Sequence, residues 1–115
     1  MEKTLSLFKA FSDPARIRIV MALKGQELCL CNLQEILVLS PSTVSRHVSI
    51  LKREGLLSSR KNGKWTYFRI SPLRNGSFKS EILRCISDSL KGDPTVKNDI
   101  MKAKALKEKE RERCE

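Results

Sequence analysis

Hydrophobic positions recur every three to four residues in five stretches of the chain, which predicts five helices. They lie near residues 5–11, 14–24, 32–38, 41–54 and 78–90. In Ser12-Asp13-Pro14 and in Ser40-Pro41, a side chain that can cap a helix stands directly before a proline suited to the first helical position. Gly25 and Gly55 are expected to end the helices that these two signals begin.

Residues 57–70 follow a different pattern. Two runs rich in β-branched, aromatic and basic residues, 57–61 and 64–70, flank Asn62-Gly63. This dipeptide tolerates positive φ at both positions, so it predicts a two-residue hairpin turn. We expect Trp65, Tyr67 and Phe68 to pack the hairpin onto the core. The order of elements therefore predicts a mainly α fold with a small β-hairpin, a winged helix-turn-helix.

Gly92-Asp93-Pro94 interrupts the helical pattern and marks a boundary. We expect residues 1–91 to form one DNA-binding and dimerisation domain, and residues 92–115 to form a charged, exposed helix or a flexible tail. No apolar run approaches the roughly 20 residues that span a bilayer, and the first residues do not resemble a secretion signal. The expected location is the cytoplasm.

Positive charge is concentrated in the middle of the chain. The formal net charge is +10, and residues 40–75 hold eight Lys or Arg against Glu54 alone, a net +7. A basic centre between nearly neutral flanks is typical of a protein that binds a polyanion, whereas an ordinary solvated surface mixes both signs. Double-stranded DNA is the partner that this distribution favours.

The helix at residues 41–54 has an apolar side and a side of small hydrogen-bonding groups. Val44, Val48 and Leu51 are expected to be buried. The opposite side is a candidate for major-groove contact, because serines weaken a helix and a merely solvated face usually favours Glu, Lys and Gln. The predicted DNA-binding residues on the helix and at the hairpin tip are Ser42, Thr43, Ser45, Arg46, His47 at the border, Ser49, Arg60, Lys61 and Lys64.

Apolar residues in the first and fifth helices have little to cover within one small domain. We therefore predict a homodimer, whose twofold symmetry would read an inverted repeat in operator DNA. The predicted interface residues are Leu5, Phe8, Ile82, Ile86 and Leu90.

Two cysteines one residue apart, Cys29 and Cys31, precede the third helix. Two thiolates without a nearby histidine select soft ions such as As(III), Sb(III), Cd(II), Pb(II) or Cu(I). Two alternatives are a thiol redox switch, disfavoured by the strained ring that the pair would form, and a thiol-dependent enzyme. Because the chain has no phosphate-binding glycine loop and no histidine outside the candidate reading helix, we do not expect an enzyme.

Three segments together resemble the ArsR (ArsR/SmtB) family of bacterial metalloregulatory repressors. They are residues 11–19 (FSDPARIRI), 27–33 (ELCLCNL) and 42–48 (STVSRHV), the last followed by Glu54-Gly55-Leu56. The resemblance covers about residues 5 to 90. It implies a homodimeric winged helix-turn-helix repressor that releases its operator when a toxic ion binds, with As(III) or Sb(III) as inducer and no organic cofactor.

The resemblance also shows one departure in the metal site. In the arsenic-sensing branch, the ELCxC segment supplies thiolates, and many members have a third cysteine where this chain has Gln34. Because As(III) prefers three sulfurs, the candidates for the third ligand are Cys85, Cys114, a cysteine of the other subunit or a small cellular thiol. A two-point clamp by Cys29 and Cys31 alone is the remaining alternative.

Overall fold

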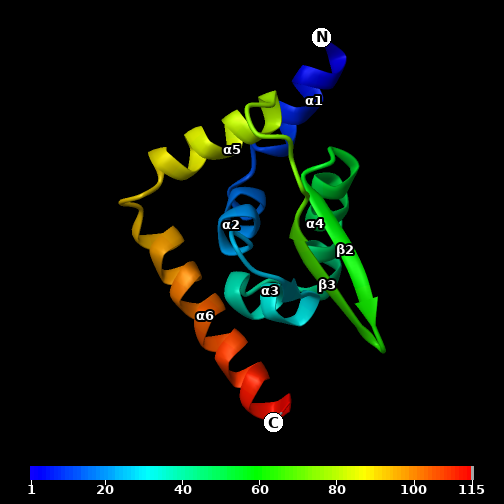
Figure 1. Ribbon diagram of the computed structural model, residues 1–115, viewed down its shortest axis with the longest axis vertical. Helices are drawn as coiled ribbons and strands as arrows, with labels where there is room; N and C mark the ends of the chain where they lie inside the picture. Colours follow the sequence, from blue (N-terminus) through cyan, green and yellow to red (C-terminus); the bar gives the residue numbers. More distant parts are fainter. Residues whose placement is uncertain (115) are drawn as a thin grey trace.

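The computed structural model describes residues 1–114, with side chains through residue 110. This part of the chain folds into six helices and a three-stranded sheet whose β2–β3 hairpin stands at one side of the molecule (Figure 1). The elements, in chain order, are α1 (Glu2–Ala10), α2 (Pro14–Ala22), β1 (Leu28–Cys29), α3 (Leu30–Leu37), α4 (Pro41–Arg53), β2 (Leu57–Asn62), β3 (Trp65–Ile70), α5 (Phe78–Ser89) and α6 (Pro94–Cys114). Within the described residues, no helix combines the length and hydrophobicity that a bilayer crossing needs.

The two predicted capping signals are confirmed. The Asp13 carboxylate accepts a hydrogen bond from the backbone N–H of Ala15 at 2.8 Å, and the Ser40 hydroxyl accepts one from that of Thr43 at 3.3 Å. Each cap satisfies an N–H that the helix itself leaves without a partner. Gly55 follows α4 with a φ of +74°, a conformation that costs glycine little. These local signals determine where α2 and α4 begin.

Helices α2, α3 and α4 pack around one hydrophobic core, which the sheet and α6 extend. The apolar positions predicted for α4 are buried, and α3 packs directly against α4 in the helix-turn-helix arrangement. The most deeply buried large side chains are Ile19, Leu23, Leu28, Leu33, Ile36, Leu51 and Leu56. Burial of such side chains contributes about 1.5–3 kcal/mol each relative to exposure.

The sheet has three strands in the order β1-β3-β2, so the predicted hairpin is only part of it. The two-residue strand β1 pairs antiparallel with β3, with Leu28 opposite Phe68 and Cys29 opposite Tyr67. The hairpin turn also lies one residue later than expected. Asn62 still pairs with Trp65, and Gly63 (φ +62°) is the first of the two turn residues. Glycine at this first position is typical of a type II′ turn.

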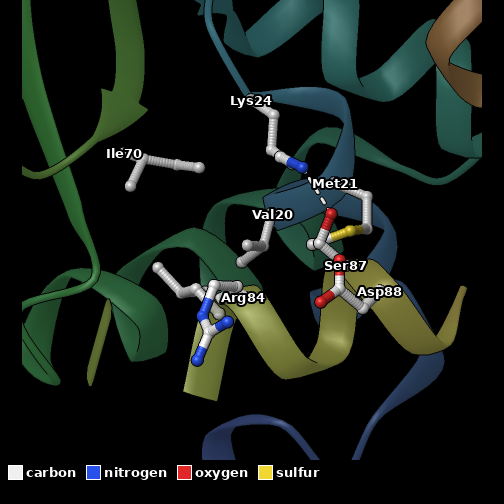
Figure 2. Close-up of a pocket in the computed structure, with 8 residues that line it drawn as sticks. Val20, Met21, Lys24, Ile70, Arg84, Ser87 and Asp88 are labelled. Carbon is white, nitrogen blue, oxygen red and sulfur yellow. Dashed lines mark hydrogen bonds between the residues drawn. The ribbon is translucent and has the colours of Figure 1, made fainter. Parts of the chain in front are cut away.

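Helix α5 lies on the outside of α2 and contains no fully buried residue. The ammonium of Lys24, two residues beyond the end of α2, donates a hydrogen bond to the hydroxyl of Ser87 in α5 (Figure 2). Beneath α5 is a hollow of about 280 Å³, lined in part by Val20, Met21 and Leu83. Helix α5 is therefore held to the core on one side while much of its surface remains accessible.

Helix α6 returns along α2 and α3 and packs against both (Figure 1). We expected an exposed helix or a flexible tail. The helix instead buries Val96, Asp99 and Ala103, although most of its charged residues are exposed. The Asp99 carboxylate, 1% exposed, accepts hydrogen bonds from Nε and Nη2 of Arg18 at 2.7 and 2.9 Å. This ion pair and the small buried residues explain the docking, which the charge-dense sequence concealed.

The Arg18–Asp99 pair generates a prediction about stability. Asp99→Asn is expected to lower the free energy of unfolding by roughly 2 kcal/mol, less than the roughly 3–5 kcal/mol typical of a fully buried pair that loses one partner, because Arg18 is 27% exposed. Urea denaturation measures the difference. Glu108→Gln removes a charge from an exposed position of the same helix and should change stability by less than about 0.5 kcal/mol. Equal midpoints for the Asp99→Asn protein and wild type would contradict this account of the docking.

Candidate functional site

The side of α4 that faces away from the core carries most of the predicted DNA-contacting residues. Ser42, Ser45, Arg46 and Ser49 are exposed, and Thr43 is partly exposed. The Ser40 hydroxyl also donates to the hydroxyl of Thr43 at 2.8 Å, which orients the first turn of the helix. The structure therefore places these polar groups together on one accessible face.

His47 is the exception, because the structure turns it toward the core. Its side chain is 6% exposed, and Nη1 of Arg16 lies 3.2 Å from its Nδ1. Burial lowers the pKa of His47 below its ordinary value, which favours the neutral ring. The prediction that His47 belongs to the DNA-contacting face is corrected by this packing between α2 and α4.

The hairpin stands beside the outer face of α4. A hollow of about 340 Å³ between them is lined by Ser45 and Ser49 of α4 and by Arg60 and Lys61 of β2. The ammonium of Lys52 donates to the Ser59 hydroxyl at 2.8 Å and so joins the helix to the hairpin. The β2–β3 hairpin is the wing of the fold. Helix α4 and this wing thus present one basic surface, as contact with the phosphate backbone across adjacent DNA grooves requires.

Arg60 has a partner that the sequence did not indicate. Its Nε and Nη2 each donate a hydrogen bond of 2.8 Å to a different oxygen of Glu27, and its guanidinium carbon lies 4.8 Å from the centre of the Tyr67 ring. The Arg60 guanidinium lowers the pKa of Glu27, so the carboxylate stays charged. Arg60 is therefore oriented toward the cysteine segment, whereas Lys61 and Lys64 occupy the exposed hairpin tip.

The cysteine pair lies at the junction of β1 and α3. Cys29 is the last residue of β1 and the N-cap of α3, and its sulfur accepts a hydrogen bond from the backbone N–H of Asn32 at 3.4 Å. The Asn32 side chain accepts from the backbone N–H of Cys29 at 3.2 Å, which completes a capping box. Cys31 is already within the helix and is exposed. Cys29 itself has an extended backbone (φ −79°, ψ 167°), whereas Leu30 and Cys31 are the first two residues of α3, so the pair spans the start of the helix.

The two thiols differ in environment. Cys29 is only 5% exposed. Burial, followed by a side-chain hydrogen bond with Cys31, raises the pKa of the Cys29 thiol to about 11. At neutral pH the Cys29 thiol is therefore protonated, and it becomes a strong soft-metal ligand only when an ion displaces its proton.

The structure gives the cysteine pair no complete set of ligands within the described residues. No group of three or more Cys, His, Asp or Glu there is arranged to hold a metal ion. Cys85 is exposed on α5, which lies at the other end of the molecule from α3 (Figure 1). Position 114 ends α6, and its side chain lies outside the described residues. Two sulfurs are a donor set that suits a soft ion and leaves coordination positions open.

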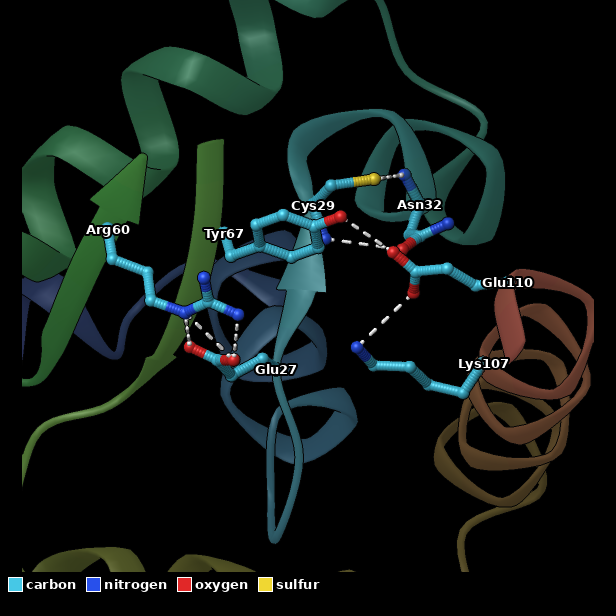
Figure 3. Close-up of polar contacts among 7 residues, drawn as sticks. All are labelled: Glu27, Cys29, Asn32, Arg60, Tyr67, Lys107 and Glu110. Atoms are coloured by element: carbon cyan, nitrogen blue, oxygen red, sulfur yellow. Dashed lines mark hydrogen bonds and ion pairs between the residues drawn. The ribbon is translucent and has the colours of Figure 1, made fainter. Parts of the chain in front are cut away.

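The sequence analysis expected Trp65, Tyr67 and Phe68 to pack onto the core, but only Phe68 is buried: Trp65 is 46% exposed, and Tyr67 lies with Cys29 on the outer face of the sheet. The Tyr67 hydroxyl donates to Oε1 of Glu110 at 2.7 Å, and Nζ of Lys107 lies 3.3 Å from Oε2 of the same carboxylate (Figure 3). The Glu110 hydrogen bond and burial raise the pKa of Tyr67 to about 12. Alternation along an extended chain puts Glu27 on the same face as Cys29, a signal that the sequence analysis did not use. No pattern within a few residues of the sequence indicated that β3 and α6 lie beside Glu27 and Cys29.

Of the predicted dimer residues, the two in α1 are half-exposed where α1 meets the start of α5 (Figure 1). Leu5 and Phe8 are 51% and 52% exposed, and the ring of Phe8 meets that of Phe78 edge to face at 6.2 Å. Ile82, Ile86 and Leu90 are partly buried against the core. The structure thus brings the two predicted segments together at the surface.

Comparison with known proteins supports this architecture. Residues 13–59 match the profile described as "Bacterial regulatory protein, arsR family". The chain is 44% identical over 69 residues to the arsenical resistance operon repressor of Escherichia coli, an alignment that covers 59% of each chain. It is 30% identical over 102 residues to the arsenic resistance transcriptional regulator ArsR1 of Pseudomonas putida, covering 88% of this chain and 73% of the relative.

The chain belongs to the arsR family of bacterial regulatory proteins. Its relatives are transcriptional regulators, and they differ in the metal that their names give. The cadmium resistance regulatory protein CadC of Listeria innocua is 37% identical over 84 residues, which cover 66% of this chain and 71% of the relative. The family assignment therefore establishes a DNA-binding transcriptional regulator but leaves its inducer open.

Solved structures agree with the fold of this ArsR-family chain. Reduced HlyU from Vibrio cholerae superposes with a TM-score of 0.66 at 27% identity, over 81% of this chain and 90% of that one. A homodimeric winged helix-turn-helix DNA-binding domain from Mycobacterium bovis superposes with a TM-score of 0.62 at 20% identity, over 76% of this chain and 75% of that one. The predicted winged helix-turn-helix is confirmed.

The contrast between the two cysteines of this ArsR-family protein can be measured by alkylation. Iodoacetamide reacts with the thiolate, so at pH 7.5 Cys31 is expected to react at least about tenfold faster than Cys29, which is buried and has a pKa of about 11. The Cys29 rate should keep rising as the pH approaches 11. Mass spectrometry of peptides after timed quenching gives both rates, with urea-unfolded protein as control. Equal rates in the folded protein would contradict the assigned environment of Cys29.

Proposed function

We propose that this protein is a transcriptional repressor that leaves its operator when As(III) or Sb(III) binds Cys29 and Cys31. The supporting observation is the position of the pair. Cys29 joins strand β1, which pairs with the wing, to helix α3, which packs against the DNA-facing helix α4. A change at this single residue therefore reaches both DNA-contacting elements. The arsenic regulators among the relatives support the choice of inducer.

The binding chemistry requires no redox step. Cys29 and Cys31 would each replace one hydroxyl of arsenous acid, and each thiol proton would leave with that hydroxyl as water. Cys29 would then no longer present its sulfur to the Asn32 N–H, so the first turn of α3 would lose its side-chain cap. Loss of a cap costs about 0.5–2 kcal/mol, which falls in the range of typical allosteric coupling energies.

We further propose that the active form is a homodimer formed through the α1–α5 surface. Half-exposed Leu5, Phe8 and Phe78 are expected to be covered by the same surface of a second copy. The description of a neighbour of the same fold as homodimeric supports dimer formation. The proposed DNA-binding and dimerisation elements all fall within residues 1–91, whereas α6 would serve the cysteine site.

For the third sulfur we propose Cys114. Glu110 of α6 accepts a hydrogen bond from the Tyr67 hydroxyl, and Tyr67 lies opposite Cys29 in the β1–β3 strand pair. Residues four apart share a face of a regular helix, so the Cys114 side chain would fall on the same face of α6 as Glu110. Cys85 would be too far away within one chain, as Figure 1 shows for α5 and α3.

The proposed function is tested by DNA release. Operator duplexes selected by the protein from random sequences are labelled, and binding is followed by fluorescence anisotropy at fixed ionic strength. Arsenite is expected to weaken wild-type binding by roughly tenfold or more, the effect of about 1.4 kcal/mol of coupling. Cys29→Ser and Cys31→Ser should bind DNA as wild type does and lose the response.

Cys85→Ser is the matched control and should respond as wild type does, because Cys85 is remote from the pair. Release of the Cys29→Ser protein by arsenite would show that the ligand assignment is wrong. Parallel titrations separate the alternatives. A response to Cd(II) or Pb(II) alone would assign the protein to the cadmium-type regulators represented among its relatives, and a response to peroxide alone would assign a thiol redox switch.

The third ligand can be counted directly. X-ray absorption of the arsenite-loaded protein, prepared without added thiols, is expected to show three sulfurs around arsenic in wild type and in Cys85→Ser. Cys114→Ser should show two sulfurs and one oxygen. Three sulfurs in the Cys114→Ser protein would assign the third ligand to another chain, and two in wild type would mean that the pair acts alone.

A further inference from the structure

The outer face of the sheet carries a continuous row of three chemically different side chains. Cys29 of β1 lies opposite Tyr67 of β3, and Tyr67 lies opposite Arg60 of β2. Residues directly opposite each other in an antiparallel sheet point to the same face, with Cβ atoms about 4.5–5.5 Å apart. Tyr67 is thus the residue between the thiol and the guanidinium of the wing (Figure 3).

Helix α6 holds Tyr67 from the other side. The phenol hydroxyl donates to Oε1 of Glu110 at 2.7 Å, and Nζ of Lys107 lies 5.5 Å from the centre of the ring. The guanidinium carbon of Arg60 lies 4.8 Å from the centre of the same ring. The Tyr67 ring is therefore in contact with cations from both the wing and α6. A hydrogen bond to a carboxylate is among the stronger neutral-to-charged contacts in proteins.

Arg60 is fixed in the same cluster through Glu27. Two hydrogen bonds of 2.8 Å join its guanidinium to a carboxylate located two residues before Cys29. Such a forked contact constrains the orientation of both partners. The strand that carries Cys29 therefore sets the direction of a basic wing residue, and Tyr67 lies against both.

We propose that Tyr67 is a positioning residue that couples the cysteine pair to the wing, and that its hydrogen bond to Glu110 is a latch over Cys29 that opens when a soft ion binds. This inference rests on the proposed function and adds the route by which that function reaches the wing. The latch is needed because Cys29 is 5% exposed: an ion reaches its sulfur only when the groups covering it move. Movement of Tyr67 then displaces its contact with Arg60.

The first test uses the ion-free protein, so it is independent of arsenic chemistry. Tyr67→Phe removes the hydroxyl and keeps the ring. It is expected to raise the iodoacetamide rate at Cys29 roughly three- to tenfold, the effect of losing one hydrogen bond, without changing the rate at Cys31. Glu110→Gln should act in the same direction. Glu108→Gln removes an equal charge from an exposed site on α6 and should leave the Cys29 rate unchanged.

The second test measures the coupling ratio, defined as the DNA dissociation constant with arsenite divided by that without it. Tyr67→Phe should lower this ratio at least about threefold, because its wing is no longer held in the ion-free position. Arg60→Gln should lower the ratio while leaving the Cys29 alkylation rate near that of wild type. A purely structural role for Tyr67 would instead lower the melting temperature and the ion-free DNA affinity, with the ratio unchanged.

The outcomes separate this inference from the proposed function. If wild type does not release DNA under arsenite, the proposed function fails whatever Tyr67 does. If wild type releases DNA but Tyr67→Phe changes neither the Cys29 rate nor the ratio, the latch is overturned and the proposed function stands. If only the Cys29 rate changes, Tyr67 covers the thiol but does not couple it to the wing, and that part of the inference is wrong.

Discussion

The pairing of β1 with β3 is the interaction on which the rest of the site depends. Two residues, Leu28 and Cys29, form this strand, and they face in opposite directions. Leu28 enters the core, where it is completely buried, while Cys29 joins the outer row with Tyr67 and Arg60. One short pairing thus anchors the cysteine segment and places its thiol next to the wing.

The location of Cys29 at a helix start explains why this thiol suits a switch. Its sulfur accepts a hydrogen bond from the backbone N–H of Asn32 and is shielded from water, so burial and this bond together hold the thiol at the start of α3. In the proposed mechanism, a soft ion would replace this modest hydrogen bond by strong metal–sulfur bonds. Under the proposed function, local structure at the start of α3 would oppose ion binding, and this opposition would link ion affinity to DNA affinity.

Helix α6 packs beside the cysteine segment and connects it to the core. The buried Arg18–Asp99 pair holds α6 against α2, and the same helix brings Glu110 to Tyr67. Its buried positions, Val96, Asp99 and Ala103, are separated by three or four residues, but they are small or charged. Their spacing is helical, yet their chemistry does not distinguish a docked helix from a solvated one.

The sequence alone determined the features that depend on local chemistry. The caps at Asp13 and Ser40, the apolar stripe of α4 and the paired cysteines were predicted because each signal lies within a few residues. Tertiary structure decided the rest: the two-residue strand β1, the burial of His47, the Glu27–Arg60 pair and the approach of α6 to Tyr67. The physical reason is separation along the chain, since these contacts join residues 33 to 43 positions apart or depend on packing between elements. Periodicity within one segment carries no information about which other segment packs against it.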